Sequence, residues 1–400
     1  MFTGKKILVG ICGGIAAYKV CELVRELQRK GAIVRTMLTP DATRFISPLT
    51  FASLTGAPAS VDLFSSSVNE IEHIELATWP DIIAIAPATA TTIAKISSGL
   101  ADNLVTATLL ATRAKILLAP AMNTGMWQNP ATQDNISLLK NRGYFVVDPE
   151  YGPMATSLEG AGFGRLPENR TIISHLFRIL WPTKSLENKK VTITAGCTIE
   201  KIDPVRFISN HATGKMGFAL AEIAAAMGAQ VTLVHGPTFL KPPVDIDVIQ
   251  VESAHEMMEA THENYPERGI LIGAAAVSDY RPAEFSQSKI KKDKNNLTLK
   301  LKINPDILFE LKKKKTNSIH VGFALETNNE IENAAKKIVQ KGLDIIVVNN
   351  PAEDGAGFAV DTNKVKLMFA DGKIIDLPLK EKINVAAEIL KHAAKLLNNK

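Results

Sequence analysis

The chain has 400 residues, and at roughly 150 residues per domain this length predicts two or three domains. With 46% apolar, 22% charged and 6% aromatic residues, the composition excludes disordered, collagen-like and disulfide-scaffold proteins. The net charge of +5 comes largely from short lysine clusters at 289–294 and 312–315. Such clusters are typical of a solvated surface, so we expect no nucleic acid among the partners.

Cysteine usage and hydropathy predict the compartment. The three cysteines fit neither a disulfide framework nor a zinc spacing, so we expect a cytoplasmic protein. No run approaches the ~20 apolar residues that cross a membrane, and we expect no membrane partner. Two lysines before the apolar run 7–17 resemble a signal peptide, but three glycines interrupt that run. A strand, a glycine turn and a helix are the better interpretation.

In the first half, short apolar runs alternate with amphipathic stretches. The runs predicted as buried strands are 7–11, 33–38, 82–86, 116–119 and 144–147. Helices are predicted over 15–30, ending at Gly31, and over 172–180. Because the strands are continuously apolar and separated by helices, we expect a parallel sheet covered on both faces, which is a doubly wound α/β domain.

Residues 150–165 are rich in glycine and show neither helical nor strand periodicity, so they are predicted to form a loop, either functional or disordered. The polar segment 183–190 follows a Trp-Pro pair and is predicted as a linker. The expected domains are therefore 1–182 and 191–400.

The second half repeats the α/β pattern without a residue-level repeat. Strands are predicted at 191–195, 231–234, 270–272, 319–323 and 345–348. A helix is expected over 215–227, a hairpin over 365–376 through Asp371-Gly372, and a terminal helix over 382–397. We therefore expect two doubly wound, three-layer α/β domains.

Small residues and hydroxyls follow the strands of the first half. In open parallel sheets ligands bind beyond the carboxyl ends of the strands, where backbone amides at helix N-termini can approach a phosphate. The segments concerned are 12–14, 39–40, 87–92 and 120–123. The dinucleotide fingerprint G-x-G-x-x-G is absent, so an ordinary dinucleotide site is not predicted.

Taken together, four motifs carry a family resemblance. Gly-Gly-Ile-Ala-Ala-Tyr-Lys at 13–19, the segment 86–92, Ala-Asp-Asn-Leu at 101–104 and Pro-Ala-Met-Asn-Thr-Gly-Met-Trp at 120–127 resemble the flavin-containing cysteine decarboxylases. The resemblance implies a flavodoxin-like flavoprotein domain with a mainly parallel sheet. It also implies FMN bound by Gly13, Gly14, Ile15, Thr39, Pro87, Ala88, Thr89 and Ala90.

The same resemblance assigns a catalytic histidine and a substrate carboxylate site. His73 lies in a His-Ile-Glu-Leu context, and Asn123 would hold the substrate carboxylate beside Met126. A cysteine-derived carboxylate has no electron sink for the carbanion that loss of CO2 leaves. Oxidation of CH2–SH to a thioaldehyde by the flavin supplies one, and His73 could accept or relay a proton.

The glycine-rich segment departs from the family pattern. Coenzyme A biosynthetic members carry a flap cysteine that protonates the enethiolate, and here Leu158 stands at its position. Since leucine cannot donate a proton, either the reductive step is impaired or another acid, such as Glu159, performs it. Cys12 replaces a usual hydroxyl near the flavin, and Thr91 replaces a usual asparagine.

Motifs of the second half resemble phosphopantothenate–cysteine ligases. They are the segment 203–217 with its Thr-Gly-Lys-Met-Gly ending, 274–281, Lys-Ile-Lys-Lys at 289–292, 304–308 and 322–327. The resemblance implies activation of a phosphopantothenate carboxylate by CTP and Mg2+ as an acyl-cytidylate. The amine of cysteine then displaces CMP.

The ligase resemblance also assigns residues. Lys289 would contact the phosphates catalytically, and Arg206 and Asn210 would face phosphopantothenate and the acyl intermediate. The expected nucleotide-binding residues are Ala274, Ala275, Asp279, Lys289, Pro305, Asp306, Ile307, Leu308, Phe323, Lys337 and Lys341. Cys197 replaces a glycine common in the turn after the first strand, where its side chain is expected to crowd a phosphate.

Both halves together, in this order, resemble the bifunctional phosphopantothenoylcysteine decarboxylase/phosphopantothenate–cysteine ligases of bacterial coenzyme A synthesis. The implied partners are 4′-phosphopantothenate, cysteine and CTP, with self-association through both domains and the flavin site built between subunits. One alternative is an active ligase fused to a decarboxylase that stops before reduction. A phosphatase-binding regulatory subunit is disfavoured by the ligase motifs, and a flavin prenyltransferase by the presence of a ligase half.

Overall fold

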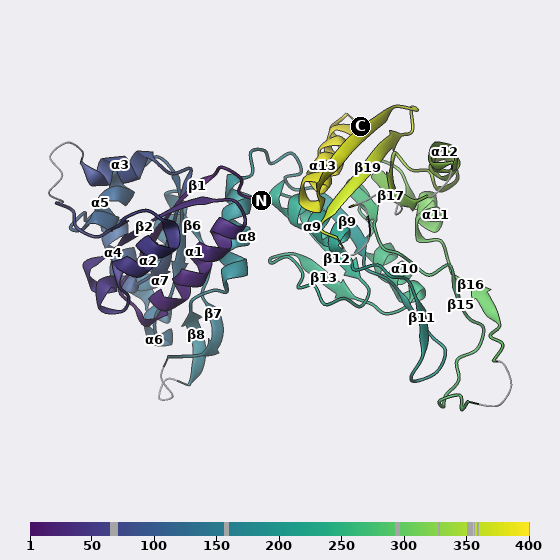
Figure 1. The fold of residues 1–400 in the computed structure, drawn as a ribbon, viewed down its shortest axis with the longest axis horizontal. Coiled ribbons are helices and arrows are strands. Elements are labelled where there is room, and N and C mark those ends of the chain that lie inside the picture. Colours follow the sequence, from purple (N-terminus) through teal and green to yellow (C-terminus); the bar gives the residue numbers. More distant parts are fainter. Residues whose placement is uncertain are drawn as a thin grey trace. The chain divides into compact units, whose positions relative to one another are not determined.

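The computed structural model describes residues 1–64, 71–155, 160–292, 297–326, 329–349, 355, 357 and 360–399. The chain divides into two compact units, Met1–Trp181 and Pro182–Lys400 (Figure 1). Each unit is an α/β domain built around its own sheet. No described helix is long and apolar enough to cross a membrane.

The first unit contains one parallel sheet. Its strands are β1 (Lys6–Ile11), β2 (Ile33–Leu38), β3 (Ala59–Ser60), β4 (Ile82–Ala88), β5 (Lys115–Pro120) and β6 (Phe145–Val146), in the order β3-β2-β1-β4-β5-β6. All neighbouring strands pair in parallel. Without the two-residue β3, the order is the flavodoxin-like 2-1-3-4-5, with the topological switch point between β1 and β4.

Helices cover both faces of this sheet. They are α1 (Val20–Arg29), α2 (Pro48–Thr55), α3 (Glu72–Thr78), α4 (Ala90–Ser98), α5 (Leu104–Ala111), α6 (Thr124–Gln128), α7 (Pro130–Asn141) and α8 (Asn169–Leu180), with 3-10 turns η1 (Ile15–Lys19) and η2 (Pro40–Arg44). The expected helix over 15–30 is thus a 3-10 turn followed by α1. The predicted strands and the doubly wound class are confirmed.

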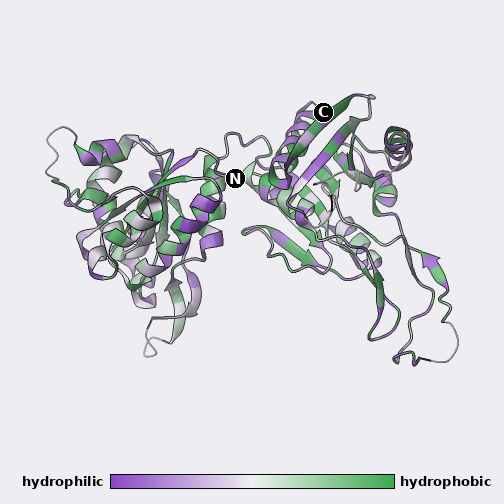
Figure 2. Cartoon of the chain, in the orientation of Figure 1, coloured by the Kyte–Doolittle hydropathy of each residue, from purple (hydrophilic) through white to green (hydrophobic). Residues whose placement is uncertain are grey.

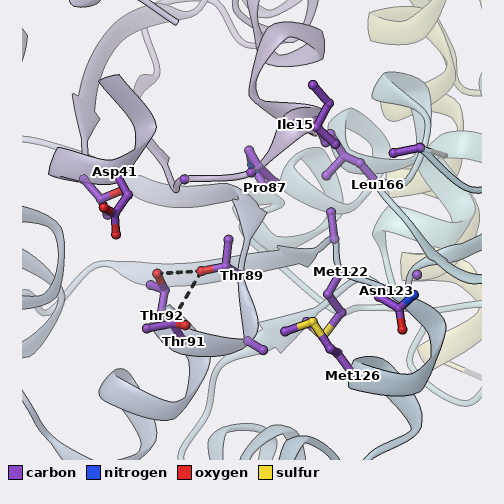
Figure 3. Close-up of a pocket in the computed structure, with 18 of the residues that line it drawn as sticks. Ile15, Asp41, Pro87, Thr89, Thr91, Thr92, Met122, Asn123, Met126 and Leu166 are labelled. Atoms are coloured by element: carbon purple, nitrogen blue, oxygen red, sulfur yellow. Dashed lines mark hydrogen bonds between the residues drawn. The ribbon is translucent and has the colours of Figure 1, made fainter. Parts of the chain in front are cut away.

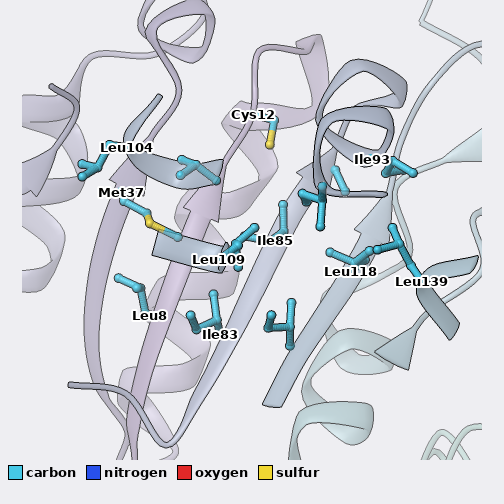
Figure 4. Packing of buried hydrophobic residues seen from close by; sticks show 14 of the residues in the cluster. Leu8, Cys12, Met37, Ile83, Ile85, Ile93, Leu104, Leu109, Leu118 and Leu139 are labelled. Atoms are coloured by element: carbon cyan, nitrogen blue, oxygen red, sulfur yellow. The ribbon is translucent and has the colours of Figure 1, made fainter. Parts of the chain in front are cut away.

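The buried strands explain why their sequences are continuously apolar. Leu8 and Ile83 pack with α4, α5 and α7 side chains such as Ile93, Leu109 and Leu139 on one face (Figure 4). Intervening strand residues are also buried, and they face the opposite layer. In Figure 2 the helices of this unit alternate between green and purple, as expected of helices with one buried and one exposed face.

The glycine-rich segment is not wholly a loop: β7 (Glu150–Pro153) and β8 (Ala161–Arg165) pair as an antiparallel hairpin. In β8 the buried positions are Gly162 and Gly164, which alternate with exposed residues. Because the inward face is glycine rather than a large apolar residue, the strand period is invisible in a hydropathy pattern. Tyr151 and Phe163 contact each other with ring centroids 5.4 Å apart.

The second unit contains a larger mixed sheet. Its strands are β9 (Lys190–Ala195), β12 (Gln230–His235), β13 (Asp247–Gln250), β14 (Ile270–Gly273), β17 (Ile319–Leu325), β18 (Ile345–Asn349), β19 (Thr362–Phe369) and β20 (Ile374–Glu381), in the order β13-β12-β9-β14-β17-β18-β19-β20. The strands from β13 to β18 are parallel, and β19 and β20 add an antiparallel hairpin. The parallel part has the Rossmann order 3-2-1-4-5-6, which confirms the predicted class.

Helices α9 (Lys215–Ala226) and α13 (Lys382–Asn398) pack together. Helices α10 (Ala254–Glu263) and α11 (Ile307–Leu311) share one apolar cluster of the unit, and α12 (Glu330–Lys341) contributes to another. Strand β13 and two small antiparallel pairs of strands were not predicted from the sequence. One pair joins β10 (Ile199–Lys201) to β11 (Phe207–Ser209), and the other joins β15 (Tyr280–Pro282) to β16 (Leu301–Ile303). Their strands are only three residues long, which is too short for a periodic signal.

Candidate functional site

A cavity of about 890 Å³ opens in the first unit where β1, β2, β4 and β5 end (Figure 3). This is the switch-point edge of the sheet, where ligands of doubly wound folds bind. Most of the residues expected to bind FMN or substrate line it: Gly13, Gly14, Ile15, Thr39, Pro87, Thr89, Ala90, Asn123 and Met126. Ala88 is fully buried in β4 and is not a lining residue.

Threonine hydroxyls cap the helical turns that follow β2 and β4. Thr39 Oγ1 accepts the backbone N–H of Ala42 at 3.3 Å, and Thr89 Oγ1 accepts that of Thr92 at 3.3 Å. The hydroxyls of Thr89 and Thr92 also lie 3.1 Å apart, as the dashed lines in Figure 3 show. The N-terminus of α4 therefore points its remaining backbone amides at the cavity wall, as an anion site requires.

Cys12 lies beneath this wall rather than in the cavity. Its side chain is fully buried, and burial raises the pKa of its thiol to about 11, opposed by hydrogen bonds from Thr92 and Thr89. The thiol is therefore protonated at neutral pH and packs as a small apolar group.

The β7–β8 hairpin forms another wall of the cavity. The backbone N–H of Met122 donates to the carbonyl of Gly164 at 2.9 Å, which fastens β8 to the turn after β5. A Cβ on Gly164 would lie 2.1 Å from the carbonyl oxygen of Met122. Only glycine allows this approach, and it places Met154, Arg165 and Leu166 on the cavity.

The amide of Asn123 has a fixed orientation. Asn123 is the N-cap of α6, and its Oδ1 accepts the backbone N–H of Gly125 at 2.7 Å. Because the oxygen is used by the helix, the Nδ2 hydrogens are left to donate to a ligand. This is the donor that a substrate carboxylate requires.

Charged residues of the cavity were missed by the sequence analysis. Lys95 and Asp102 form an ion pair of 2.6 Å, and the hydrogen bond from Lys95 lowers the pKa of Asp102. Lys19 and Arg165 also line the cavity, and burial, followed by the Arg165 charge, lowers the pKa of Lys19. Lys19 ends the quoted motif 13–19 and Arg165 ends the glycine-rich segment 150–165, so the available signal was the position of each beside glycines.

Of the predicted catalytic residues that the structure describes in this unit, His73 does not line the cavity. His73 is half-buried on α3, and its Nδ1 has no hydrogen-bond partner among the described residues. Leu158 and Glu159 lie outside the described residues.

In the second unit, glycines allow three turns to approach one another at the end of β9. Gly196 and Gly214 both have a positive φ, and a Cβ on Gly214 would lie 3.4 Å from the Gly196 Cα. A Cβ on Gly236 would lie 1.7 Å from the carbonyl oxygen of Cys197. The Cys197 Sγ lies 4.0 Å from the carbonyl oxygen of Pro237. The α9 N-terminus, β9 and β12 therefore meet with little side-chain bulk between their backbones.

Asn210 is joined to the loop that follows β14. Its Nδ2 donates to the carbonyls of Ala276 and Val277 at 3.1 and 3.2 Å. These bonds commit both amide hydrogens and leave Oδ1 as the acceptor. The same loop is fastened to β9, because the N–H groups of Ala274 and Ala275 donate to the backbone and side-chain oxygens of Thr194, at 3.1 and 3.3 Å.

The expected nucleotide residues gather near the ends of β14 and β17. Asp306 is the N-cap of α11 and pairs with Lys341 at 2.8 Å, and Leu308 packs on Gly273. Lys337 pairs with Glu326 at 2.6 Å, and hydrogen bonds from Lys337 and Asn333 outweigh burial and lower the pKa of that carboxyl.

The rest of this set is placed as follows. Ile307 is buried, Pro305 and Phe323 are half-buried, and Asp279 is exposed. The carbonyl of Asp279 accepts the N–H of Asn304 at 2.8 Å. Among the described residues, no group of three His, Cys, Asp or Glu side chains could hold a metal ion.

Lys289 and Arg206 lie on two connected segments. Lys289 is exposed, whereas Arg206 forms an ion pair of 2.6 Å with the buried Asp203 and donates to the carbonyl of Ile290 at 2.8 Å. Arg206 Nη1 makes no hydrogen bond to the described residues and remains available to a ligand. Roles were predicted from the sequence for Arg206 and Lys289, whereas Asp203 was only part of the quoted segment 203–217.

Two family models match the chain. The Flavoprotein model matches residues 1–180, and the model for the C-terminal domain of DNA/pantothenate metabolism flavoproteins matches residues 186–397. The chain is 43% identical to the "Coenzyme A biosynthesis bifunctional protein CoaBC" of Bacillus subtilis (strain 168), over 99% of this chain and 98% of that protein. It is 42% identical to the protein of that name from Escherichia coli (strain K12), over 95% and 94% of the two chains.

Two solved structures each match part of the chain. The C-terminal domain of a coenzyme A biosynthesis bifunctional protein CoaBC is 40% identical, with a TM-score of 0.47, and covers 55% of this chain and 100% of that one. The FMN-dependent cysteine decarboxylase SpaF is 31% identical, with a TM-score of 0.37, and covers 41% and 91%.

Proposed function

The chain belongs to the family of bifunctional coenzyme A biosynthesis proteins, enzymes that join a flavoprotein decarboxylase domain to a ligase domain, and on this premise we propose how its two units perform the two reactions. Residues 191–400 ligate cysteine to 4′-phosphopantothenate. Residues 1–182 decarboxylate the product to 4′-phosphopantetheine, and 183–190 link the two domains. The ligase product is the decarboxylase substrate, which gives the fusion a chemical rationale.

The cavity of the first unit carries the decarboxylase proposal, because its walls provide the groups that FMN and a carboxylate require. Its turns supply backbone amides at the start of α4, the hydroxyl of Thr39 and the small residues of the turn 13–15. These groups suit a flavin mononucleotide, with its single phosphate and polar ring edge. When bound, FMN supplies the two-electron oxidation of CH2–SH that makes loss of CO2 possible.

The residues of the cavity would position and neutralise the substrate. Asn123 donates from Nδ2 to the carboxylate without protonating it, so the carboxylate stays ionised until CO2 leaves. Lys19 and Arg165 add positive charge on the side of the hairpin. His73 would serve a cavity other than that of its own chain, which agrees with a flavin site assembled between subunits.

The ligase step follows from the charges near β14 and β17. A carboxylate oxygen of phosphopantothenate attacks the α-phosphorus of CTP, and pyrophosphate leaves. The amine of cysteine then attacks the acyl carbon, loses a proton and expels CMP. Lys289, Lys337 and Lys341 would neutralise the phosphates, and Asn210 Oδ1 would accept a hydrogen bond from the substrate.

Mg2+ is proposed to bind together with the triphosphate. Magnesium usually takes one or two carboxylates plus substrate phosphates and water, rather than a cage made by the protein alone. The absence of a three-ligand cluster among the described residues fits that mode.

Release of pyrophosphate tests the ligase assignment. We expect it to require CTP, 4′-phosphopantothenate and Mg2+ together, to be faster with CTP than with ATP, and to stop when EDTA removes the metal. Decarboxylation of phosphopantothenoylcysteine added directly is the matched control, and EDTA should leave it unchanged. Pyrophosphate release that is equally fast with and without 4′-phosphopantothenate would contradict the proposal.

A further inference from the structure

The carboxylate of Asp203 is enclosed by hydrogen-bond donors from two segments far apart in the sequence. Its side chain is 0% exposed. Oδ1 accepts the backbone N–H groups of Val205 and Arg206, both at 2.8 Å. Oδ2 accepts Arg206 Nε at 3.0 Å, Arg206 Nη2 at 2.6 Å and the backbone N–H of Ile290 at 3.1 Å. One buried carboxylate thus orders both the β10–β11 turn and the segment around residue 290.

These five hydrogen bonds exclude metal binding and proton transfer as roles for Asp203. With both oxygens used by N–H donors, the carboxylate has no open lone pair for a metal ion and no route to a substrate proton. The hydrogen bonds from Arg206 hold the pKa of the Asp203 carboxyl well below its usual range, against the effect of burial. Asp203 is therefore ionised throughout the working pH range and acts only through its neighbours.

The segment that carries Lys289 is docked at three points on the β10–β11 turn. The N–H of Ser286 donates to the carbonyl of Ile202 at 3.0 Å. The N–H of Ile290 donates to Asp203, and the carbonyl of Ile290 accepts Arg206 Nη2 at 2.8 Å. Lys289 itself is exposed between these contacts.

We propose that Asp203 is a positioning residue of the ligase reaction, which fixes the Arg206 guanidinium and the Lys289 segment as one unit. This inference rests on the proposed ligase function and adds a residue to it. Arg206 Nε and Nη2 both donate to Asp203, and these bonds fix the plane of the guanidinium group. The position of Nη1, which could contact a ligand, is therefore fixed as well. The Lys289 backbone is held by its neighbour Ile290. A displacement of either cation by about 1 Å is enough to cost about 100-fold in rate.

Asp203→Asn is the variant that tests this proposal, because it keeps the size of the side chain while removing its charge and one acceptor oxygen. We expect kcat/KM for ligation to fall about 100-fold. KM for CTP should rise while KM for cysteine stays unchanged, because the Lys289 segment serves the phosphates. Amide hydrogen exchange at Ile290 should become faster. Decarboxylation of added phosphopantothenoylcysteine should not change.

Asp344→Asn is the matched control. Asp344 is also a largely buried carboxylate, paired with Lys315 at 2.6 Å and accepting the N–H of His320 at 2.8 Å, but it directly precedes β18, at the end of the sheet where the parallel strands begin. We expect this variant to lower the free energy of unfolding without changing KM for CTP. If both variants changed ligation equally, Asp203 would be only a structural residue and the proposal would be overturned.

Two further results separate this inference from the proposed function. If wild-type protein performed no ligation, the proposed function would fail, whereas exchange at Ile290 would still report whether the contact exists. If the Ile290 amide of wild-type protein exchanged as fast as an unprotected peptide, the positioning role would be wrong even with ligation intact. This second measurement needs no variant, so it stands if Asp203→Asn does not fold.

Discussion

Replacing Gly164 with alanine is expected to reduce decarboxylation by at least about 100-fold while ligation continues at the wild-type rate. The added Cβ would lie 2.1 Å from the carbonyl oxygen of Met122, which is backbone and cannot rotate away. Gly164 also has a φ of +144°, which side chains rarely adopt. We expect β8 to detach from the Met122 turn and to withdraw Arg165 and Leu166 from the cavity.

Release of CO2 from phosphopantothenoylcysteine measures this effect, and pyrophosphate release in the same preparation reports on the ligase. Gly160→Ala is the matched control, because Gly160 has a φ of +65° but no atom of the described residues within 4 Å of its ideal Cβ. Gly160→Ala therefore strains the backbone at a positive φ without adding a steric clash like that between a Cβ at position 164 and the Met122 carbonyl oxygen. Equal losses in the two variants would show that general strain in the hairpin, rather than its docking on Met122, limits the reaction.

Replacing Asn210 with aspartate is expected to reduce ligation by about 100- to 1,000-fold and to leave decarboxylation unchanged. Asn210 Nδ2 donates to the carbonyls of Ala276 and Val277, and a carboxylate can donate to neither. It would instead place a negative charge beside two carbonyl oxygens and close to the site proposed for CTP. Repulsion should displace the side chain and weaken binding of the anionic nucleotide.

The measurement is the rate of pyrophosphate release at saturating cysteine. Asn264→Asp is the matched control, because Asn264 Nδ2 also donates to a backbone carbonyl, that of Ala260, at 2.9 Å. Asn264 lies at the C-terminal end of α10, where no site residue is assigned. Wild-type ligation by the Asn210 variant would show that the amide does not contribute to the reaction.

The fold was predictable from the sequence where whole strands are buried, because complete burial leaves a continuous run of apolar residues. β1, β4 and β9 are buried along almost their whole length, so their sequences are continuously apolar and their type is evident. The β7–β8 hairpin was missed because Gly162 and Gly164 occupy its inward face. There, close approach to the Met122–Thr124 turn replaces hydrophobic packing, and no hydropathy signal results.

The site was predictable in part. The turns after the strands of the first unit converge on one cavity because parallel strands end at one edge, which the sequence pattern implies. Lys19 ends the motif 13–19 and Arg165 ends the glycine-rich segment 150–165, but their common cavity depends on the hairpin. Asp203 contacts a residue 87 positions away, and no local pattern indicates such a pairing.

The central claim is that one chain converts 4′-phosphopantothenate and cysteine into 4′-phosphopantetheine. Its most direct test is mass spectrometry of the product formed by purified, FMN-loaded protein with 4′-phosphopantothenate, cysteine, CTP and Mg2+. A product lighter by two hydrogens would mean decarboxylation without reduction, which is the result expected if no other acid replaces the cysteine that Leu158 displaces, and it would contradict the claim. We predict the mass of 4′-phosphopantetheine, whereas accumulation of phosphopantothenoylcysteine, or no conversion at all, would contradict the account.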